Sequence, residues 1–477
     1  MKPTIESLPE EILEKVFLNL SPYQEYDNVA LVCKQWRRVI AGVASQLQKR
    51  FEEAFNIRKL AWTEVCLNVS RHPANSSFMS PRLLHSMCYN DETRSVYVFG
   101  GRSVGSQSAG FNDLWRLNMH TKRWERPIIY GDFPRPKFGC SLESYKNVLV
   151  LYGGRSMPRS APFVLYHPDY CSDELHIFDT HTSKWKLKQS IQDAPPALYL
   201  HGSCIVANQS EDGDECMLIF GGIKERGGGD SSEIWCLDLP TYNWWKPTII
   251  GPPPEARHMH TQAAFRSEYT FSSAVLIVGG STTENRILTD AWILTRSGFR
   301  EWTSTSLAIR PGPRDFLPQI SVFKRSGVKV GQNLIFFGST PSNKASCKRK
   351  SIRRFYPYED QEIQSVLNGE CNNILERHRN PLCVYILNLS RTISDNILTW
   401  KTSLSENDNN VDCNMLGPDK PNYHLAVVAR GEIVVHGDFP LENPQVIERT
   451  FRQSHNFLNG MGSNKWTPLY FLSANIT

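Results

Sequence analysis

Residues 96–101, VYVFGG, and residues 111–124, FNDLWRLNMHTKRW, form a unit that recurs along this 477-residue chain. In each copy a short β-branched and aromatic run ends in glycine, and a second run with a late tryptophan follows. Six copies are recognisable, and the later five begin at VLVLYGG (148–154), MLIFGG (217–222), VLIVGG (275–280), LIFFGS (334–339) and IVVHGD (433–438). Periods near 50 residues are typical of propeller blades.

The composition of each copy predicts a meander of four antiparallel strands. The apolar run suits an inner strand buried on both faces, and the glycines allow backbone angles and close approaches that side chains would block. Turn residues before the tryptophan, as in NMHTKRW and DTHTSKW, predict a hairpin between two outer strands. One meander cannot bury both of its faces, so the copies must stack in a closed ring. We therefore predict a mainly β fold, a propeller of about six four-stranded blades.

The unit resembles the kelch repeat, with the glycine pair and the tryptophan in place in copies one to four. Copy five has Ser339 in place of the second glycine and a long insertion at 340–382, and copy six keeps Gly437 alone. Ala61-Trp62-Thr63-Glu64 is similar to the outer strand of the final copy. We therefore expect an N-terminal strand to complete the last blade and close the ring.

The first 55 residues have a different pattern, which predicts two or three short helices. Ser7 and Glu10 have capping-box spacing, so a helix should begin near Leu8. A second apolar set, from Val29 to Val43, indicates another amphipathic helix. So small a unit rarely supplies its own core, and its apolar surface is either a lid on the next domain or a face for another protein. We expect a helical domain at 1–55, a linker with the closing strand at 56–84, and the propeller at 85–477.

This helical segment resembles an F-box, although the usual acidic-leucine pair is absent around Tyr23 to Asn28. The resemblance implies docking onto the Skp1 subunit, and through it onto the cullin and RING subunits, of an SCF-type ubiquitin ligase. The chain would be a non-catalytic substrate receptor without a cofactor, whose propeller binds the protein to be ubiquitinated. The residues that correspond to the Skp1-binding motif are Leu8, Pro9, Ile12, Val16, Phe17, Leu20, Val32, Cys33 and Trp36.

Basic residues recur where each copy would begin its first strand. In a four-stranded blade this point and the end of the glycine strand lie at the same rim, so the ring should gather these cations around one end of its channel. Guanidinium groups suit carboxylates and phosphates, which suggests capture of an acidic or phosphorylated segment, with His85, His201 and His260 behind the rim. The alternative is that these side chains only bind loop carbonyls. The candidates are Arg82, Arg102, Arg135, Lys137, Arg155, Arg257 and Arg314.

Composition limits the other classes of function. The 53 basic and 48 acidic side chains give a net charge of only +5, so no nucleic-acid or membrane partner is expected. The 12 cysteines form no regular framework and no signal peptide opens the sequence, which favours a cytoplasmic or nuclear protein. The basic tract CKRKSIRR (347–354) is either a nuclear import or polyanion-binding tract or a solvated loop.

Two alternative functions remain open. Kelch-like blades also occur in copper oxidases, but no cluster of His, Tyr and Cys ligands stands out here, and His258-Met-His260 has no evident third ligand. The other alternative is a non-proteolytic scaffold that binds Skp1 without cullin. Copurification with Skp1 and cullin would separate these possibilities.

Overall fold

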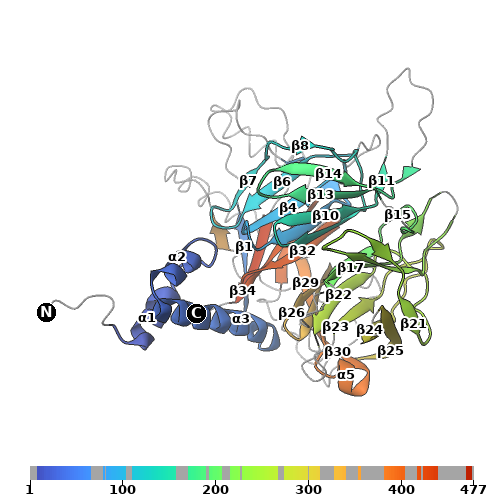
Figure 1. Ribbon diagram of the computed structural model, residues 1–477. Helices are drawn as coiled ribbons and strands as arrows, with labels where there is room; N and C mark the ends of the chain where they lie inside the picture. The colour runs from blue at the N-terminus through green and yellow to red at the C-terminus, as the bar shows by residue number, and fades with distance from the viewer. Residues whose placement is uncertain are drawn as a thin grey trace, which may run out of the picture.

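The computed structural model shows a β-propeller with a helical unit against one side (Figure 1). The structure describes residues 8–65, 79–80, 82–103, 110–156, 170–189, 193–206, 215–225, 228–266, 273–298, 300–311, 327–339, 353–355, 381–402, 416–419, 423–438 and 469–474. Arg314 and most of the 340–382 insertion lie outside these residues.

Within the described residues the chain forms six units of four antiparallel strands, here called blades 1 to 6. Blade 1 consists of β3 (Ser86–Asn90), β4 (Ser95–Phe99), β6 (Leu114–Asn118) and β7 (Arg123–Glu125). Blade 2 consists of β9 (Ser141–Tyr145), β10 (Val148–Tyr152), β13 (Leu175–Asp179) and β14 (Lys184–Lys188). Blade 3 consists of β16 (Gly202–Val206), β17 (Cys216–Phe220), β19 (Ile234–Asp238) and β20 (Trp244–Trp245).

The last three blades follow the same order. Blade 4 consists of β22 (Thr261–Arg266), β23 (Ser273–Val278), β24 (Ala291–Gly298) and β25 (Glu301–Pro311). Blade 5 consists of β26 (Val328–Val330), β27 (Asn333–Ser339), β29 (Pro381–Asn388) and β30 (Ile397–Thr402). Blade 6 consists of β32 (Tyr423–Ala429), β33 (Glu432–Asp438), β34 (Leu469–Ala474) and β1 (Leu60–Val65).

Strand β1 closes the ring, because it pairs antiparallel with β34 over its whole length, from Leu60 opposite Ala474 to Val65 opposite Leu469. The N-terminal segment therefore supplies the outer strand of the last blade. Trp62 packs against Phe337 of blade 5, with ring centroids 5.9 Å apart. This is the position of the repeat tryptophan in the other blades.

Shorter elements decorate the blades. Three short strands pair in parallel with the fourth strand of a blade: β8 (Tyr130–Gly131) with β14, β21 (Thr248–Ile250) with β25, and β28 (Arg353–Phe355) with β1. Strand β31 (Leu416–Asp419) pairs with β29. A short helix, α5 (Thr392–Asp395), precedes β30. Two-stranded pairs at the rim are β2 (Arg82–Leu83) with β5 (Arg102–Ser103), β11 (Arg155–Ser156) with β12 (Tyr170–Cys171), and β15 (Leu198–Tyr199) with β18 (Ile223–Lys224).

The core lies between neighbouring blades, as the stacked-meander prediction requires. Trp185, Trp302 and Trp400 are fully buried, and each packs against the preceding blade. The strand that carries the glycine pair is the second from the axis, not the innermost one: the first strands of the blades, such as β3, β9, β16 and β22, neighbour one another around the channel. The glycine run is thus an inner strand of the blade, and β4 and β17 are buried on both faces, as the sequence predicted.

Three helices precede the propeller: α1 (Glu10–Phe17), α2 (Glu25–Val32) and α3 (Lys34–Asn56). The N-cap of α1 is Pro9, without a side-chain hydrogen bond, so the helix begins two residues later than the capping-box pattern predicts; Ser7 lies outside the described residues. Extended backbone at Cys33 separates α2 from α3, and the Cys33 thiol accepts a hydrogen bond from the Trp36 amide.

The 23-residue helix α3 joins the helical unit to the ring. Phe51 and Phe55 near its C-terminal end belong to one buried cluster with Trp62, Ile335 and Val435 of blades 5 and 6. Helix and propeller therefore share a core. None of the described helices is long and apolar enough to cross a membrane.

Candidate functional site

The glycine pairs of blades 1 to 3 join each of these blades to the next around the channel. The amide of the second glycine donates to a carbonyl of the following blade: Gly101 to Lys137 at 3.0 Å, Gly154 to Leu198 at 2.8 Å and Gly222 to Arg257 at 2.8 Å. A Cβ on Gly153 would lie 2.6 Å from the Leu198 oxygen and 3.0 Å from Cε1 of His201. The glycines therefore make room for the backbone and imidazole of the next blade, in addition to allowing positive φ.

A second set of backbone bonds forms a collar at the channel mouth. In blades 1 to 4 the residue two positions before the first strand has a left-handed conformation, with φ of 56° at Leu84, 63° at Gly139, 59° at Leu200 and 53° at Met259. The amides of Gly139, Leu200 and Met259 donate in turn to the carbonyls of Leu84, Gly139 and Leu200, at 2.7–3.0 Å. Three of these four residues are not glycine, so the collar holds them in an uncommon conformation.

Three of the candidate basic residues turn away from the channel. Arg82, Lys137 and Arg257 are at most 1% exposed. Arg82 forms a bidentate pair with Asp113 at 2.6 and 3.0 Å, Arg257 forms the same pair with Asp290 at 2.6 and 2.8 Å, and Lys137 binds Glu174 at 2.9 Å. Their cationic groups are thus used inside the blades, and the prediction that these three contact an acidic segment is corrected.

The two aspartates also accept a hydrogen bond from the strand that follows each of them. The indole nitrogens of Trp115 and Trp292 donate to Asp113 and Asp290 at 2.7 Å. Burial opposes the ionisation of both aspartates, but the hydrogen bonds and charge of the paired arginine outweigh it and lower each pKa. The pairs are therefore ionised and fix the rim of blades 1 and 4.

The other basic candidates lie nearer the surface. Arg102 and Arg155 are half-buried and stack on aromatic rings, with Arg102 5.5 Å from the Phe138 centroid and Arg155 5.4 Å from the Tyr199 centroid. Arg135 is exposed. Arg314 lies outside the described residues. The structure therefore does not gather the six predicted cations that it describes into one binding ring.

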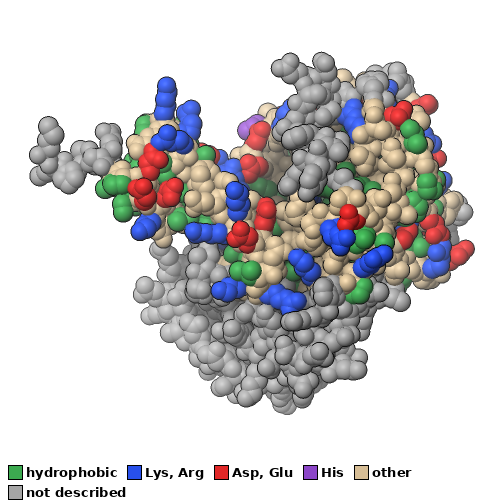
Figure 2. Space-filling view, turned by 90° about the horizontal axis from the view of Figure 1, so that it is seen from below, with side chains coloured by type: hydrophobic (Ala, Val, Ile, Leu, Met, Phe, Trp, Pro, Cys, Tyr) green, Lys and Arg blue, Asp and Glu red, His purple; other side chains and the backbone are tan. Residues whose placement is uncertain are grey.

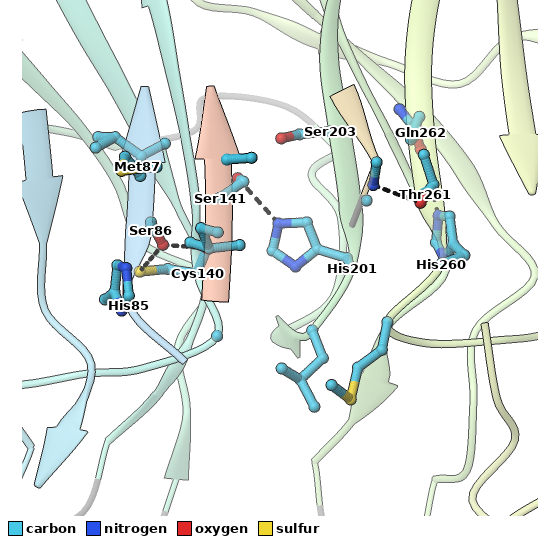
Figure 3. Close-up of a pocket in the computed structure, with 18 of the residues that line it drawn as sticks. His85, Ser86, Met87, Cys140, Ser141, His201, Ser203, His260, Thr261 and Gln262 are labelled. Carbon is cyan, nitrogen blue, oxygen red and sulfur yellow. Dashed lines mark hydrogen bonds between the residues drawn. The ribbon is translucent and has the colours of Figure 1, made fainter. Parts of the chain in front are cut away.

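The channel contains a cavity of about 440 Å³ below the collar (Figure 3). It is lined by first strands from around the ring and by the imidazoles of His85, His201, His260 and His424. The sequence predicted the first three histidines behind the rim, and His424 was missed although it stands in the same position of copy six. In blade 2 this position is Cys140, whose carbonyl accepts the Ser86 hydroxyl in Figure 3.

Hydroxyl and amide groups continue the lining beyond the histidines. His201 Nε2 lies 3.0 Å from the Ser141 hydroxyl, and the Thr261 hydroxyl accepts the Gly327 amide at 2.8 Å. Ser203 and Gln262 lie further along the strands (Figure 3). No lysine or arginine is among the described residues that line the cavity.

Three imidazoles of the channel, those of His85, His201 and His260, are uncharged at neutral pH. Burial lowers the pKa of His201 to about 4 and that of His260 to about 3. The pKa of His85 lies well below its usual range, mainly because of burial and to a smaller extent because of electrostatic interactions with His436 and Arg82. The one carboxyl group of the lining, Glu143, accepts a 2.5 Å hydrogen bond from Ser203. Burial raises the pKa of Glu143 to about 7, against the opposing effect of that bond.

His258 and His260 do not form a metal site. The two side chains point in different directions: His258 Nδ1 lies 2.7 Å from Asp230 and its Nε2 3.1 Å from Ser281, while His260 lines the channel. Among the described residues, no three His, Cys, Asp or Glu side chains are grouped to hold a metal ion.

A second candidate site is the outer surface of the helical unit, here called the apolar helix face and made of Ile12, Val16, Leu31 and Val32. These side chains are 41%, 41%, 75% and 56% exposed. Figure 2 shows hydrophobic side chains on the part of this unit that projects from the propeller. Apolar groups this exposed indicate a surface for another protein.

The structure sorts the predicted Skp1-binding residues into two groups. Pro9 and Cys33 are exposed like the apolar helix face, and Leu8, Leu20 and Trp36 are half-buried. Phe17 is 1% exposed and packs edge-on against Trp36 at 5.2 Å. The prediction of a direct contact for Phe17 is corrected, because it belongs to the helical core. Leu31, which the sequence analysis did not include, is the most exposed side chain of the apolar helix face.

The connection between α1 and α2 attaches the helical unit to the seam between blades 6 and 1. Tyr23 is buried among apolar residues of both blades, including Val96 and Phe471. Asp27 pairs with Arg94, and Arg430 donates to the Pro22 carbonyl at 2.9 Å. The partners come from hairpins at the face opposite the glycine pairs, so the helical unit and the channel collar lie at opposite faces of the ring.

Comparisons with known proteins agree with both parts of the chain. Residues 5–44 match the F-box-like family, and residues 82–302 match the family described as "FBX42, beta-propeller domain". These matches and the similarity to kelch domain-containing proteins confirm the two resemblances found in the sequence.

Several curated relatives match the propeller region. Tip elongation aberrant protein 1 of Schizosaccharomyces pombe is 27% identical over 46% of this chain and 17% of its own length. Host cell factor of Drosophila melanogaster is 30% identical over 40% of this chain and 13% of its own. Kelch domain-containing protein 2 of Bos taurus is 25% identical over 44% of this chain and 52% of its own. The chain thus spans at most about half of the length of these relatives.

Proposed function

Because the chain combines an F-box-like segment with an FBX42-type β-propeller domain, we propose that it is a non-catalytic substrate receptor of an SCF-type ubiquitin ligase. The F-box helices dock onto Skp1, and through it onto the cullin and RING subunits. The propeller holds the protein to be ubiquitinated, and holding it near the charged ubiquitin carrier raises the effective concentration of its lysines.

The apolar helix face is the observation that supports this proposal. Leu13, Phe17 and Val43 already form the core of the helical unit, so Ile12, Val16, Leu31 and Val32 are not needed to hold it together. At about 25 cal/mol per Å² of apolar surface removed from water, covering four such side chains contributes several kcal/mol to binding. Helices of a partner would complete this surface.

Skp1 capture by the full chain tests the proposal. Val16→Asp and Leu31→Asp place a charge in the apolar helix face, and each should reduce Skp1 copurification at least tenfold. Ile128→Asp is the matched control, because Ile128 is 76% exposed on the propeller. Skp1 capture that is equal in all three variants would refute the docking surface.

The presence of cullin in the captured complex tests the ligase assignment. Cullin should copurify with the wild-type chain and with Ile128→Asp, and be lost with Skp1 in the other two variants. Skp1 without cullin would identify the chain instead as a non-proteolytic scaffold.

A further inference from the structure

The cavity of the propeller channel has the size and form of a ligand site. At about 440 Å³ it falls within the usual range for small-ligand pockets, roughly 300 to 1,000 Å³. Leu200 and Met259 line it at the collar, and Glu143 lies four residues beyond the collar residue Gly139. At about 3.3 Å per residue, that carboxyl is roughly 13 Å along the strand from the mouth.

The charges around the cavity favour a cationic guest. The arginines and the lysine at the strand starts are paired with carboxylates inside the blades. The imidazoles of His201 and His260 are uncharged, and each neutral ring offers one lone pair that can accept a hydrogen bond. Hydroxyls of Ser141 and Ser203 and the amide of Gln262 add further acceptors.

Glu143 is the charged group toward which such a guest would be drawn. Ser203 donates to its Oε1 atom. Cys88 of β3 and Cys204 of β16 lie close enough to interact with its charge, and burial raises the pKa of both thiols, which keeps them neutral. No described lysine or arginine of the lining competes for the carboxylate.

We propose that the channel binds a primary ammonium group, presented by a lysine side chain or an amino terminus at the tip of a substrate segment, with Glu143 as its counter-ion. This deepens the proposed substrate role of the propeller and rests on it. It replaces the acidic or phosphorylated segment that the sequence suggested, because a carboxylate or phosphate in this cavity would face Glu143 without an unpaired cation to offset the repulsion.

Small probes test the proposal on the full chain. Met87 and Met259 line the cavity, so their labelled methyl groups report occupancy by NMR. Nα-acetyl-lysine methylamide carries the side-chain amine, leucine methylamide carries an α-amine, and acetyl-norleucine methylamide is the neutral match. The amine probes should shift both methyl signals saturably, and the preferred amine identifies the source. The neutral norleucine probe should bind at least tenfold more weakly. So should Nα-acetyl-glutamate methylamide, which carries a carboxylate in place of the amine.

Variants and pH provide the second half of the test. Glu143→Gln should weaken the amine probes at least tenfold, whereas Glu284→Gln, an exposed carboxyl at the rim, should leave them unchanged. The affinity for Nα-acetyl-lysine methylamide should rise about tenfold from pH 6 to pH 8, because its amine stays protonated while Glu143 ionises, and only the ionised Glu143 attracts an ammonium. Skp1 capture should be the same in Glu143→Gln, which separates this inference from the docking proposal. Equal binding of lysine and norleucine probes, or no methyl shift with either, would overturn it.

Discussion

The phenol of Tyr23 donates a 2.7 Å hydrogen bond to Glu432, a residue 409 positions later in the chain. Burial and the nearby Glu432 charge raise the pKa of Tyr23 well above its usual range, so the phenol keeps its proton. Lys122 of blade 1 binds the same carboxylate at 2.6 Å and lies 5.1 Å from the Tyr23 ring. The F-box connection thus joins three segments that are distant in sequence.

This contact predicts that the helical unit and the propeller unfold together. Tyr23→Phe removes the bond to a charged acceptor and should cost about 1.5 to 3 kcal/mol of unfolding free energy. Tyr23→Ala also empties the seam between blades 6 and 1 and should cost about 3 to 5 kcal/mol. Denaturant unfolding followed by propeller tryptophan fluorescence measures both. Loss of helix without any change in the propeller transition would contradict the prediction.

The buried arginine–aspartate pairs should matter for stability. Asp290→Ala leaves the buried Arg257 charge alone and should cost about 3 to 5 kcal/mol. Arg257→Ala should cost less, because the Asp290 side chain that it leaves is 40% exposed, and the double variant should cost less than the sum. Arg286→Ala is the control, because Arg286 pairs with Glu255 at an exposed site in the same region, where a pair contributes about 0 to 1 kcal/mol. Equal melting temperatures for Arg257→Ala and Arg286→Ala would argue against the structural role.

The raised pKa of the Glu143 carboxyl predicts that the free energy of unfolding decreases as the pH rises. A carboxyl group paired with a cation would have the opposite effect. The Glu143 pKa of about 7 lies above the ordinary 4.5, so the folded chain holds this proton where the unfolded chain has lost it. Stability should therefore fall as pH rises from 4.5 to 7, by at most about 3 kcal/mol, at 1.4 kcal/mol per unit difference in pKa.

Comparison with Glu143→Gln isolates this effect. The variant should match the wild type near pH 4.5 and be more stable at pH 8. Denaturation midpoints of the two chains at both pH values measure the difference. A constant difference between them would show that Glu143 titrates normally.

Two glycines should respond to alanine in opposite ways. Gly153 has a φ of 70° and no space for a Cβ, so Gly153→Ala should cost about 2 kcal/mol or more. Gly42 lies on the exposed side of α3 with nothing within 4 Å of a Cβ, so Gly42→Ala should add up to about 1 kcal/mol. Thermal unfolding of both variants checks the signs. Stabilisation by Gly153→Ala would mean that there is room for a Cβ between Gly153 and the Leu198 carbonyl of the next blade.

The sequence predicted the repeat architecture because glycine pairs and tryptophans mark each blade independently of the loops between them. It did not predict which way Arg82 and Arg257 point. An arginine before a strand looks the same in the sequence whether its side chain faces the solvent at the rim or is buried inside the blade. A comparison of the copies could have indicated the buried pairs, because the copies with Arg82 and Arg257 also have a carboxylate directly before the third strand, at Asp113 and Asp290. Copy three has Leu198 instead of a cation, and its Glu233 lies 3.5 Å from Lys246.

In the helical unit, too, the sequence predicted the elements but not the direction of individual side chains. Periodicity found an apolar face around Val16 and Phe17, but it could not separate the inward Phe17 from the outward Val16, which are adjacent in sequence. The departure from the F-box pattern around Tyr23 could be seen, but its cause could not, because the partners Glu432 and Arg430 lie about 400 residues away. Contacts this distant leave no local periodicity.

Because β1 pairs with β34, the propeller ring can close only after the ribosome has synthesised β34. Strand β1 is synthesised early, but its partner Leu469–Ala474 follows roughly 400 residues later. At about 5 to 20 residues per second, β1 waits some 20 to 80 seconds with an open edge. A chain that stops before residue 469 would therefore leave β1 without its partner in the ring.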